Sequence, residues 1–178
     1  MNFSIEHSIQ ILERTPQSLR SLLYKLDENW TQNNEGGETW SPYDVIGHLV
    51  HCDEENWIPR IEVVLSDSAV RKFEPLNRFA QFEKSKGKNI NELLDHFVGI
   101  RHSSMAKLKI LNITNEQLSK TAIHPEFGSV SLSQLISAWV VHDLDHISQI
   151  TRVMAKQYKA EVGPWIQYMR ILNQETIN

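Results

Sequence analysis

Residues 132–157 read LSQLISAWVVHDLDHISQITRVMAKQ, and this stretch decides the fold. Its apolar residues recur at intervals of three and four, which is the pattern of a helix with one buried face. Ser131 is a favourable N-cap residue, so we expect a helix that begins directly after it. At 3.6 residues per turn, His142 and His146 lie one above the other in the sector of the apolar stripe. That stripe consists of Leu132, Leu135, Trp139, Ile150 and Val153.

Three further helical segments are predicted upstream. The first covers residues 5–14 and restarts at Thr15-Pro16, which combines an N-cap with a first-turn proline; the restarted helix is expected to end before Gln32. The second covers residues 42–65: Ser41-Pro42-Tyr43-Asp44 resembles a capping box, and Pro59 predicts a kink. The third covers residues 89–111, with a buried set of Leu93, Leu94, Phe97, Ile100, Met105 and Leu108.

Four long helices joined by loops of ordinary length predict an all-α fold, an up-down four-helix bundle formed as a single domain by residues 1–178. Residues 67–88 are expected to form a long loop that holds a short helix and lies near any pocket. His124-Pro125-Glu126-Phe127-Gly128 is expected to be a turn, and residues 165–172 a short C-terminal helix on the bundle. No segment alternates with the period of two that predicts a strand.

The composition excludes several classes of function. The 178 residues include 18 Lys and Arg against 22 Asp and Glu, with no basic cluster, which argues against a primary nucleic-acid-binding role. One Cys excludes a disulfide framework and a four-cysteine zinc site. No apolar run approaches the roughly 18 residues of a membrane span, and the N-terminus lacks the basic residues of a signal peptide. We therefore expect a soluble cytoplasmic protein without a membrane partner.

The chain contains eight histidines, and their positions carry more information than their number. Two imidazoles on an apolar face are costly unless their ring nitrogens find partners. Hydrogen bonds would satisfy His142 and His146, but one shared metal ion would satisfy both at once. His48, on the predicted 42–65 helix, shares an inward-facing stripe with Val45, Cys52 and Glu55. One His from this helix and two from the last form a set that holds a catalytic divalent metal and leaves coordination positions open.

Several neighbours allow alternatives. His51 follows His48 by three residues and could ligate in its place, although His48 lies nearer the centre of the inward stripe. Cys52 is the only thiol that could close the site as a fourth ligand, but its position equally suits a small core residue. Glu55, two turns from His48, is a candidate proton carrier or the partner in a salt bridge at the rim.

The remaining polar residues near the histidine motif have simpler expectations. Asp143 and Asp145 flank His142, and Asp145 is expected to face solvent. Gln149 either lines the pocket or caps a buried polar group. The other histidines have no ligand spacing and are expected at the surface or in loops: His7, His96, His102 and His124.

Taken together, these motifs resemble the DinB-like superfamily. Trp40-Ser41-Pro42 leading to Gly47-His48-Leu49 looks like the opening of the family's second helix. Residues 139–150, WVVHDLDHISQI, closely resemble its fourth-helix signature, and Val162-Gly163-Pro164-Trp165 is similar to the ending of many members. The similarity covers most of the chain and is more specific than two histidines four residues apart.

The resemblance implies a four-helix bundle that binds a divalent metal ion through one histidine of the second helix and two of the fourth. In this sequence they are His48, His142 and His146, which favours His48 over His51. Nickel, zinc, manganese and iron all suit three imidazoles. Members are often dimers, so a homodimer is expected. Some members transfer low-molecular-weight thiols such as bacillithiol or mycothiol to electrophiles, and others are described as metal-dependent hydrolases.

Two classes of function follow. The first is a metal-dependent enzyme acting on a small molecule. It is either a thiol transferase, in which the metal lowers the pKa of an incoming cofactor thiol, or a hydrolase, in which a bound water attacks with Glu55 as a candidate base. The resemblance slightly favours the transferase. The second class is a non-catalytic bundle that binds a ligand or partner helix, with a structural metal or none; a site closed by Cys52 would favour it.

Overall fold

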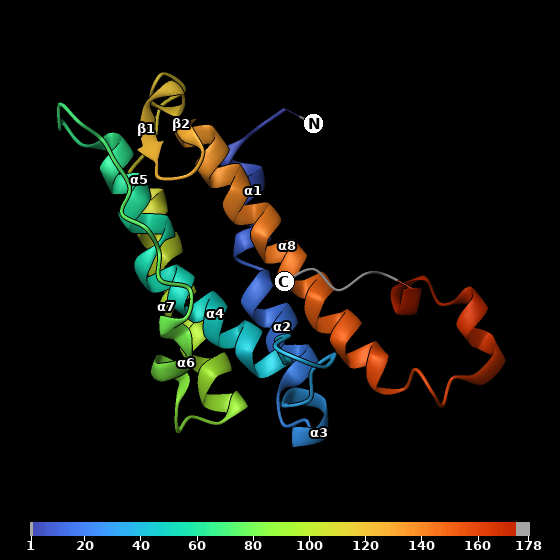
Figure 1. Cartoon of the computed structure of the whole chain (residues 1–178). Coiled ribbons are helices and arrows are strands. Elements are labelled where there is room, and N and C mark those ends of the chain that lie inside the picture. Colours follow the sequence, from blue (N-terminus) through green and yellow to red (C-terminus); the bar gives the residue numbers. More distant parts are fainter. Residues whose placement is uncertain (1, 174–178) are drawn as a thin grey trace.

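The computed structural model describes residues 2–173, and its long helices form four arms of a bundle (Figure 1). The all-α four-helix bundle predicted from the sequence is confirmed. The first arm is broken into α1 and α2, and the second into α4 and α5. The arms are α1 (Ile5–Leu12) with α2 (Thr15–Leu23), α4 (Pro42–Glu55) with α5 (Trp57–Leu65), α7 (Ile90–Ile110), and α8 (Leu132–Gln157).

The order of the arms differs from a simple up-down bundle at one connection. α4 and α7 run parallel, as two contacts show. Tyr43 at the start of α4 donates to the carbonyl of Lys88, just before α7, and Asp53 near the end of α4 pairs with Arg101, further along α7. The segment 66–79 makes this possible by returning along α5 (Figure 1). Its 14 residues can span up to about 46 Å when extended, well beyond the roughly 14 Å length of α5.

Side-chain caps explain where the long helices begin. Capping boxes form at the starts of α4, α7 and α8, through Ser41 with Asp44, Asn89 with Glu92 and Ser131 with Gln134. The predicted cap at Thr15 is wrong: α2 begins at Thr15 itself, whose hydroxyl donates back to the carbonyl of Ile11.

The kink predicted from Pro59 is a full break. α4 ends at Glu55, four residues before Pro59, and Asn56 separates it from α5. The reason is that proline has no N–H to donate to the carbonyl of Glu55, and its ring clashes with that carbonyl.

The connection between α7 and α8 holds two short strands that the sequence did not predict. β1 (Thr121–His124) pairs antiparallel with β2 (Gly128–Ser131), and the predicted turn at residues 124–128 joins them. Neither strand sequence, TAIH or GSVS, alternates regularly between apolar and polar residues, so the period of two is absent. An isolated bridge between Lys72 and Ile123 ties this hairpin to the 66–79 segment.

Short elements fill the other connections, and the end of the chain differs from the prediction. The short helix expected within residues 67–88 is α6 (Ala80–Ser85), and α3 (Glu28–Thr31) and the 3-10 turn η1 (Gln117–Ser119) lie in the other loops. In place of one C-terminal helix there are two 3-10 segments, η2 (Gly163–Tyr168) and η3 (Arg170–Asn173). Only η3 touches α8 closely, and Figure 1 shows this end projecting beyond the bundle.

The buried apolar residues form two clusters, one around Trp57 and Trp139 and the other around Leu49 and Phe97. The stripe predicted on α8 is buried throughout. Both α4 and α8 contribute to each cluster, so the middle of these two helices lies between the clusters, and this is where the predicted histidines fall.

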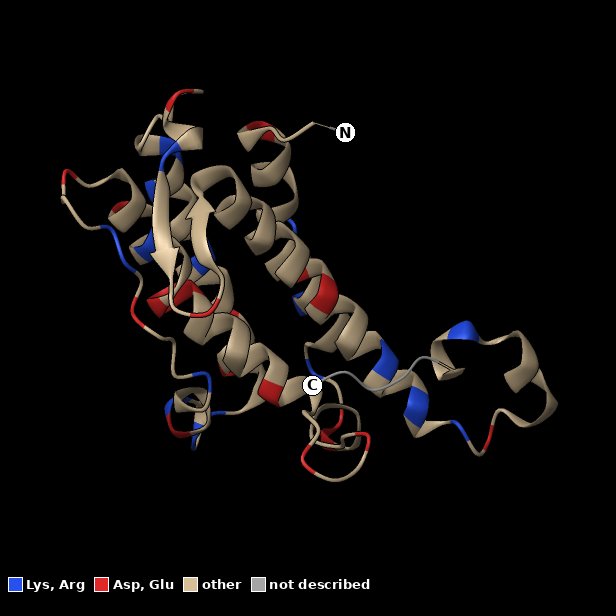
Figure 2. Cartoon of the chain, turned by 45° about the horizontal axis from the view of Figure 1, so that its top comes forward, with Lys and Arg blue, Asp and Glu red and all other residues tan. Residues whose placement is uncertain are grey.

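The surface carries both signs of charge. Lys and Arg positions are interspersed with Asp and Glu positions along the described helices and loops (Figure 2). Among residues 2–173, no helix combines the length and the apolar character needed to cross a membrane. The charge distribution agrees with the formal net charge of −4 counted from the sequence.

Candidate metal centre

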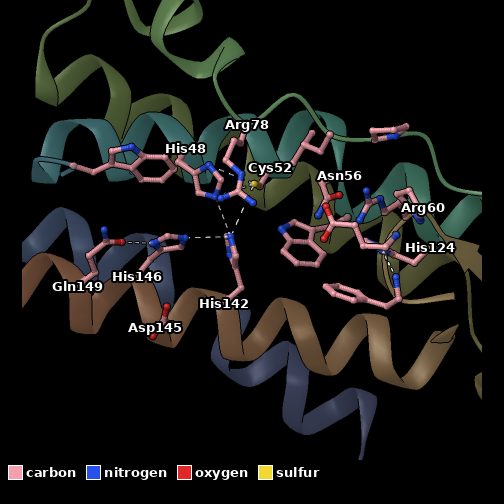
Figure 3. A pocket seen from close by; sticks show the side chains of 17 residues that line it. His48, Cys52, Asn56, Arg60, Arg78, His124, His142, Asp145, His146 and Gln149 are labelled. Carbon is pink, nitrogen blue, oxygen red and sulfur yellow. Dashed lines mark hydrogen bonds between the residues drawn. The ribbon is translucent and has the colours of Figure 1, made fainter. Parts of the chain in front are cut away.

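Three histidine side chains from α4 and α8 meet at one point, and they are the three predicted from the sequence (Figure 3). The Nε2 atom of His142 lies 3.1 Å from Nε2 of His48 and 3.2 Å from Nε2 of His146. One ligand atom from each residue lies within 4.8 Å of the other two. His48 is buried at 7% exposure, whereas His142 and His146 are partly open to solvent.

Two of the three rings, those of His48 and His146, are held in the neutral form that metal coordination requires. Burial, followed by the neighbouring imidazoles, lowers the pKa of His48 to about 2. Burial and His142 lower the pKa of His146 to about 4. The Nδ1–H of His146 donates to Oε1 of Gln149 at 2.7 Å, which leaves the lone pair of its Nε2 directed at the cluster.

Hydrogen bonds among the rings cannot satisfy all three. A single N–H on Nε2 of His142 would have to serve both neighbouring Nε2 atoms, and its buried Nδ1 would remain without a partner. A divalent cation would use all three Nε2 lone pairs together. The residues therefore fit a metal ion better than they fit a hydrogen-bonded histidine cluster.

The structure separates His48 from its two neighbouring alternatives. His51 is buried, and its Nε2–H donates to the carbonyl of Asn77 at 3.0 Å, so it anchors the 66–79 segment. Cys52 Sγ lies 3.4 Å from Nε2 of His48 and 4.0 Å from Nε2 of His142, and burial raises its pKa to about 12. The Cys52 thiol is thus protonated and packs beside the cluster, outside the three-histidine group.

Glu55 is not brought to the three histidines. Its side chain is 54% exposed and its carboxylate pairs with Lys84 at 2.7 Å. The break at Asn56 ends α4 at this position. Ligand atoms of His51, Glu54 and Glu55 also lie within 4.8 Å of one another, but the Lys84 ammonium already pairs with both carboxylates. The structure supports the rim salt bridge and gives no support to a catalytic Glu55.

The histidines form part of the wall of a pocket of about 550 Å³. Aromatic rings flank them: Trp40 lies 4.9 Å from His48 and Trp57 lies 5.1 Å from His142, centroid to centroid. The expectation that the 67–88 loop lies near the pocket is confirmed, because the segment 66–79 and the hairpin turn supply further walls. The lining from these two segments comprises Pro75, Leu76, Arg78, His124, Pro125, Glu126 and Phe127.

The polar neighbours of the histidine motif take different positions. Asp145 is exposed, as expected, and lines the pocket beside His146 (Figure 3). His7 and His102 are exposed, and His96 lies 3.3 Å from Glu54. His124 is not in a loop as expected: it is the last residue of β1, is half-buried and lines the pocket, which its isolated position in the sequence did not indicate.

A buried ion cluster behind the site was missed from the sequence. Arg101 of α7 is 1% exposed and pairs with Asp53 of α4 and Asp143 of α8, both fully buried. It also donates to the carbonyl of Leu12 at 2.9 Å. Asp53 and Asp143 lie one residue from Cys52 and His142, so Arg101 fixes both metal-site helices. The sequence feature that could have indicated this ion cluster is the position of Arg101 among the buried apolar residues of α7.

Fold and site together define a helical bundle that carries a three-histidine candidate metal centre between its second and fourth arms. A sequence profile of the DinB superfamily matches residues 11–150, so this chain belongs to the DinB superfamily. The family resemblance stated from the motifs is therefore confirmed.

One solved structure supports the fold. YfiT from Bacillus subtilis, described as a probable metal-dependent hydrolase with an unusual four-helix bundle topology, has a TM-score of 0.73 to this chain. The match covers 88% of this chain and 90% of YfiT at 20% sequence identity, a similarity that shows the fold alone. No curated protein has a significantly similar sequence.

Proposed function

We propose that this chain is a divalent-metal-dependent enzyme that hydrolyses a small molecule. The observation that carries the proposal is the convergence of three imidazoles on one wall of an open pocket. A fully enclosed site with four protein ligands would indicate a structural metal, whereas three ligands leave positions for a substrate. YfiT, which shares the fold, is itself described as a probable metal-dependent hydrolase.

The residues around the centre have three roles: metal binding, orientation of a metal-binding histidine, and proton acceptance. His48, His142 and His146 would hold the cation, which when bound supplies Lewis-acid polarisation of a substrate oxygen. Gln149 keeps Nδ1 of His146 protonated and its Nε2 free. Two carboxylates line the same pocket, those of Asp145 and Glu126, and they are the acidic side chains available there to accept a proton.

A second candidate is the transfer of a low-molecular-weight thiol to an electrophile. The pocket, at about 550 Å³, is within the range of ligand sites that hold drug-sized molecules, so it has room for a small thiol and its acceptor. The chain itself supplies no reactive thiolate, because burial raises the pKa of Cys52 to about 12. A thiol reaction in this pocket therefore requires a thiol that arrives with the substrate.

One panel separates these chemistries. Metal-loaded protein is assayed for hydrolysis of carboxylic esters, phosphate esters and amides. It is assayed for conjugation with a model electrophile in the presence of bacillithiol, mycothiol, glutathione or coenzyme A. Turnover of an ester without added thiol supports the hydrolase; turnover that requires one thiol supports the transferase. Either activity is expected to disappear in His48→Ala and to persist in His102→Ala, which removes an exposed histidine on α7.

The same panel contains the outcome against catalysis. Inactivity of metal-loaded wild type toward every substrate, together with a large fall in melting temperature when the metal is removed, would favour a structural metal in a binding module. Activity that survives His48→Ala would show that the three histidines are not the reactive centre.

A further inference from the structure

The pocket has a second polar region that the three histidines do not use. Arg60 of α5 and Asn56, which joins α4 to α5, both line it (Figure 3). In Figure 3 they lie beyond Cys52, away from the end of the pocket marked by His146 and Gln149. A ligand that occupies the pocket from one end to the other would therefore contact both regions.

Arg60 is fixed in place but has donors to spare. Its guanidinium carbon lies 5.0 Å from the centroid of the buried Phe73 ring, and its Nη2 donates to the carbonyl of Glu74 at 3.2 Å. The side chain is partly buried, and burial lowers its pKa, although an arginine remains charged at neutral pH. Within residues 2–173, no carboxylate oxygen lies within 4.0 Å of the Arg60 guanidinium.

Asn56 supplies an independent sign of a ligand. The residue is only 5% exposed, and its Oδ1 has no hydrogen-bond partner in the described structure. A buried amide oxygen without a hydrogen-bond partner is unfavourable unless a ligand supplies one. Because Oδ1 only accepts hydrogen bonds, it would bind a donor of the ligand, such as a hydroxyl or an amine next to the group held by Arg60.

Arg60 is the charged residue that would hold an anion at this end of the pocket. Arg60 and Arg78 are its permanent cations, and a bound divalent metal would add two further positive charges. Asp145 and Glu126 are its carboxylates, and within residues 2–173 neither lies within 4.0 Å of either arginine guanidinium. Glu126 is on the hairpin turn, where its N–H donates to His124 Nδ1, and His124 lies beside Arg60 (Figure 3). Asp145 lies beside His146, at the end opposite Arg60 (Figure 3).

We propose that Arg60 binds an oxyanion group of the substrate, a carboxylate or a phosphate, and that Asn56 Oδ1 accepts from a neighbouring hydroxyl or amine, while the reactive part of that substrate lies at the three histidines. The proposed substrate class is therefore a small acidic molecule. This inference rests on the proposed function for the role of the histidines, but the anion site itself is a property of Arg60 and can be tested without turnover.

The test is isothermal titration with two probes, inorganic phosphate and malonate, into zinc-loaded protein and into chelator-treated protein. Wild type is expected to bind at least one probe in both forms. Arg60→Gln is expected to weaken that binding at least tenfold, because the bidentate charged contact is lost. The control is Arg20→Gln, which removes a positive charge of α2 that forms an exposed ion pair with Asp95 of α7. This variant is expected to bind the probes with an affinity within twofold of wild type.

The outcomes are distinguishable. Arg60-dependent binding of phosphate alone assigns a phosphate subsite, and of malonate alone a carboxylate subsite; both support the proposal. Wild type that binds neither probe, or that binds only when zinc is present and equally well in Arg60→Gln, overturns it. Arg60→Lys keeps the charge and most of the stem over Phe73, so it tests the same point if the Gln variant folds poorly, and severalfold weaker binding is expected. Failure of the enzymatic panel would leave these titrations unaffected.

Discussion

Replacing Arg101 with Met should lower the free energy of unfolding of this protein by more than the substitution of any exposed charged residue does. The guanidinium makes paired hydrogen bonds to both Asp53 and Asp143 and a further one to the carbonyl of Leu12. Arg101→Met retains much of the apolar stem but leaves two fully buried carboxylates without a cation. Breaking a buried pair in this way costs about 3–5 kcal/mol.

The pH dependence provides a second signature. Burial raises the pKa of Asp53 to about 6 even with Arg101 present, and Arg101 is what lowers the pKa of Asp143 despite its burial. Without Arg101 both pKa values should rise, so the folded variant binds protons that the unfolded chain, with Asp near 3.9, does not. The stability of the variant therefore falls as the pH rises through the raised pKa values. The difference in free energy of unfolding between wild type and variant should accordingly be smaller at about pH 5 than at about pH 7.

Urea unfolding of wild type and Arg101→Met at both pH values measures this directly. Arg20→Met serves as the matched control, because its ion pair with Asp95 is solvent-exposed and worth about 1 kcal/mol or less. A deficit below about 1 kcal/mol at pH 7 would refute the view that Arg101 neutralises two buried charges. So would a deficit that grows as the pH falls.

Three further predictions follow from the site. Gln149→Leu removes the acceptor of the His146 Nδ1–H, so zinc affinity measured by titration should fall by about 10- to 100-fold at unchanged stoichiometry; unchanged affinity would argue against this role. Glu55→Gln should keep metal affinity and turnover within twofold, because its carboxylate pairs with Lys84; a tenfold loss of kcat/KM would reinstate a catalytic role. Metal-free protein should lose stability as the pH falls from about 6.5 to 4. The reason is that unfolded histidines bind protons that His48 and His146, with pKa values of about 2 and about 4, do not bind when folded. Urea titrations at several pH values test this, and a profile unchanged by His48→Ala would contradict it.

The sequence predicted those parts of the fold that depend on local pattern. The helix over residues 132–157 has the predicted bounds, since Ser131 caps it and a continuous apolar stripe buries it. The same stripe placed His142 and His146 inward, and helical spacing placed His48 opposite them. The inward stripe favoured His48 over His51 and the family resemblance strengthened that preference, which the bond from His51 to Asn77 now explains.

Features that depend on distant partners could not be predicted in this way. Helical spacing placed Glu55 on the face of His48, but Pro59 ends α4 there, and Lys84 of α6 holds the carboxylate outside the pocket. Arg101 pairs with residues more than forty positions away, and one sequence contains no record of such pairing. The return of residues 66–79 along α5 likewise depends on tertiary packing, because the sequence pattern of a loop indicates how long the loop is but not the direction in which it runs.

Metal binding by the three histidines is the central claim, and metal stoichiometry tests it most directly. Elemental analysis and zinc titration are performed on wild type, His142→Ala and His102→Ala, with melting temperatures to confirm folding. We predict one divalent ion per chain in wild type and His102→Ala, and loss of that ion in His142→Ala, whose Nε2 lies next to both other rings. Folded wild type that binds no divalent ion, or His142→Ala that binds one as tightly as wild type, would contradict the account.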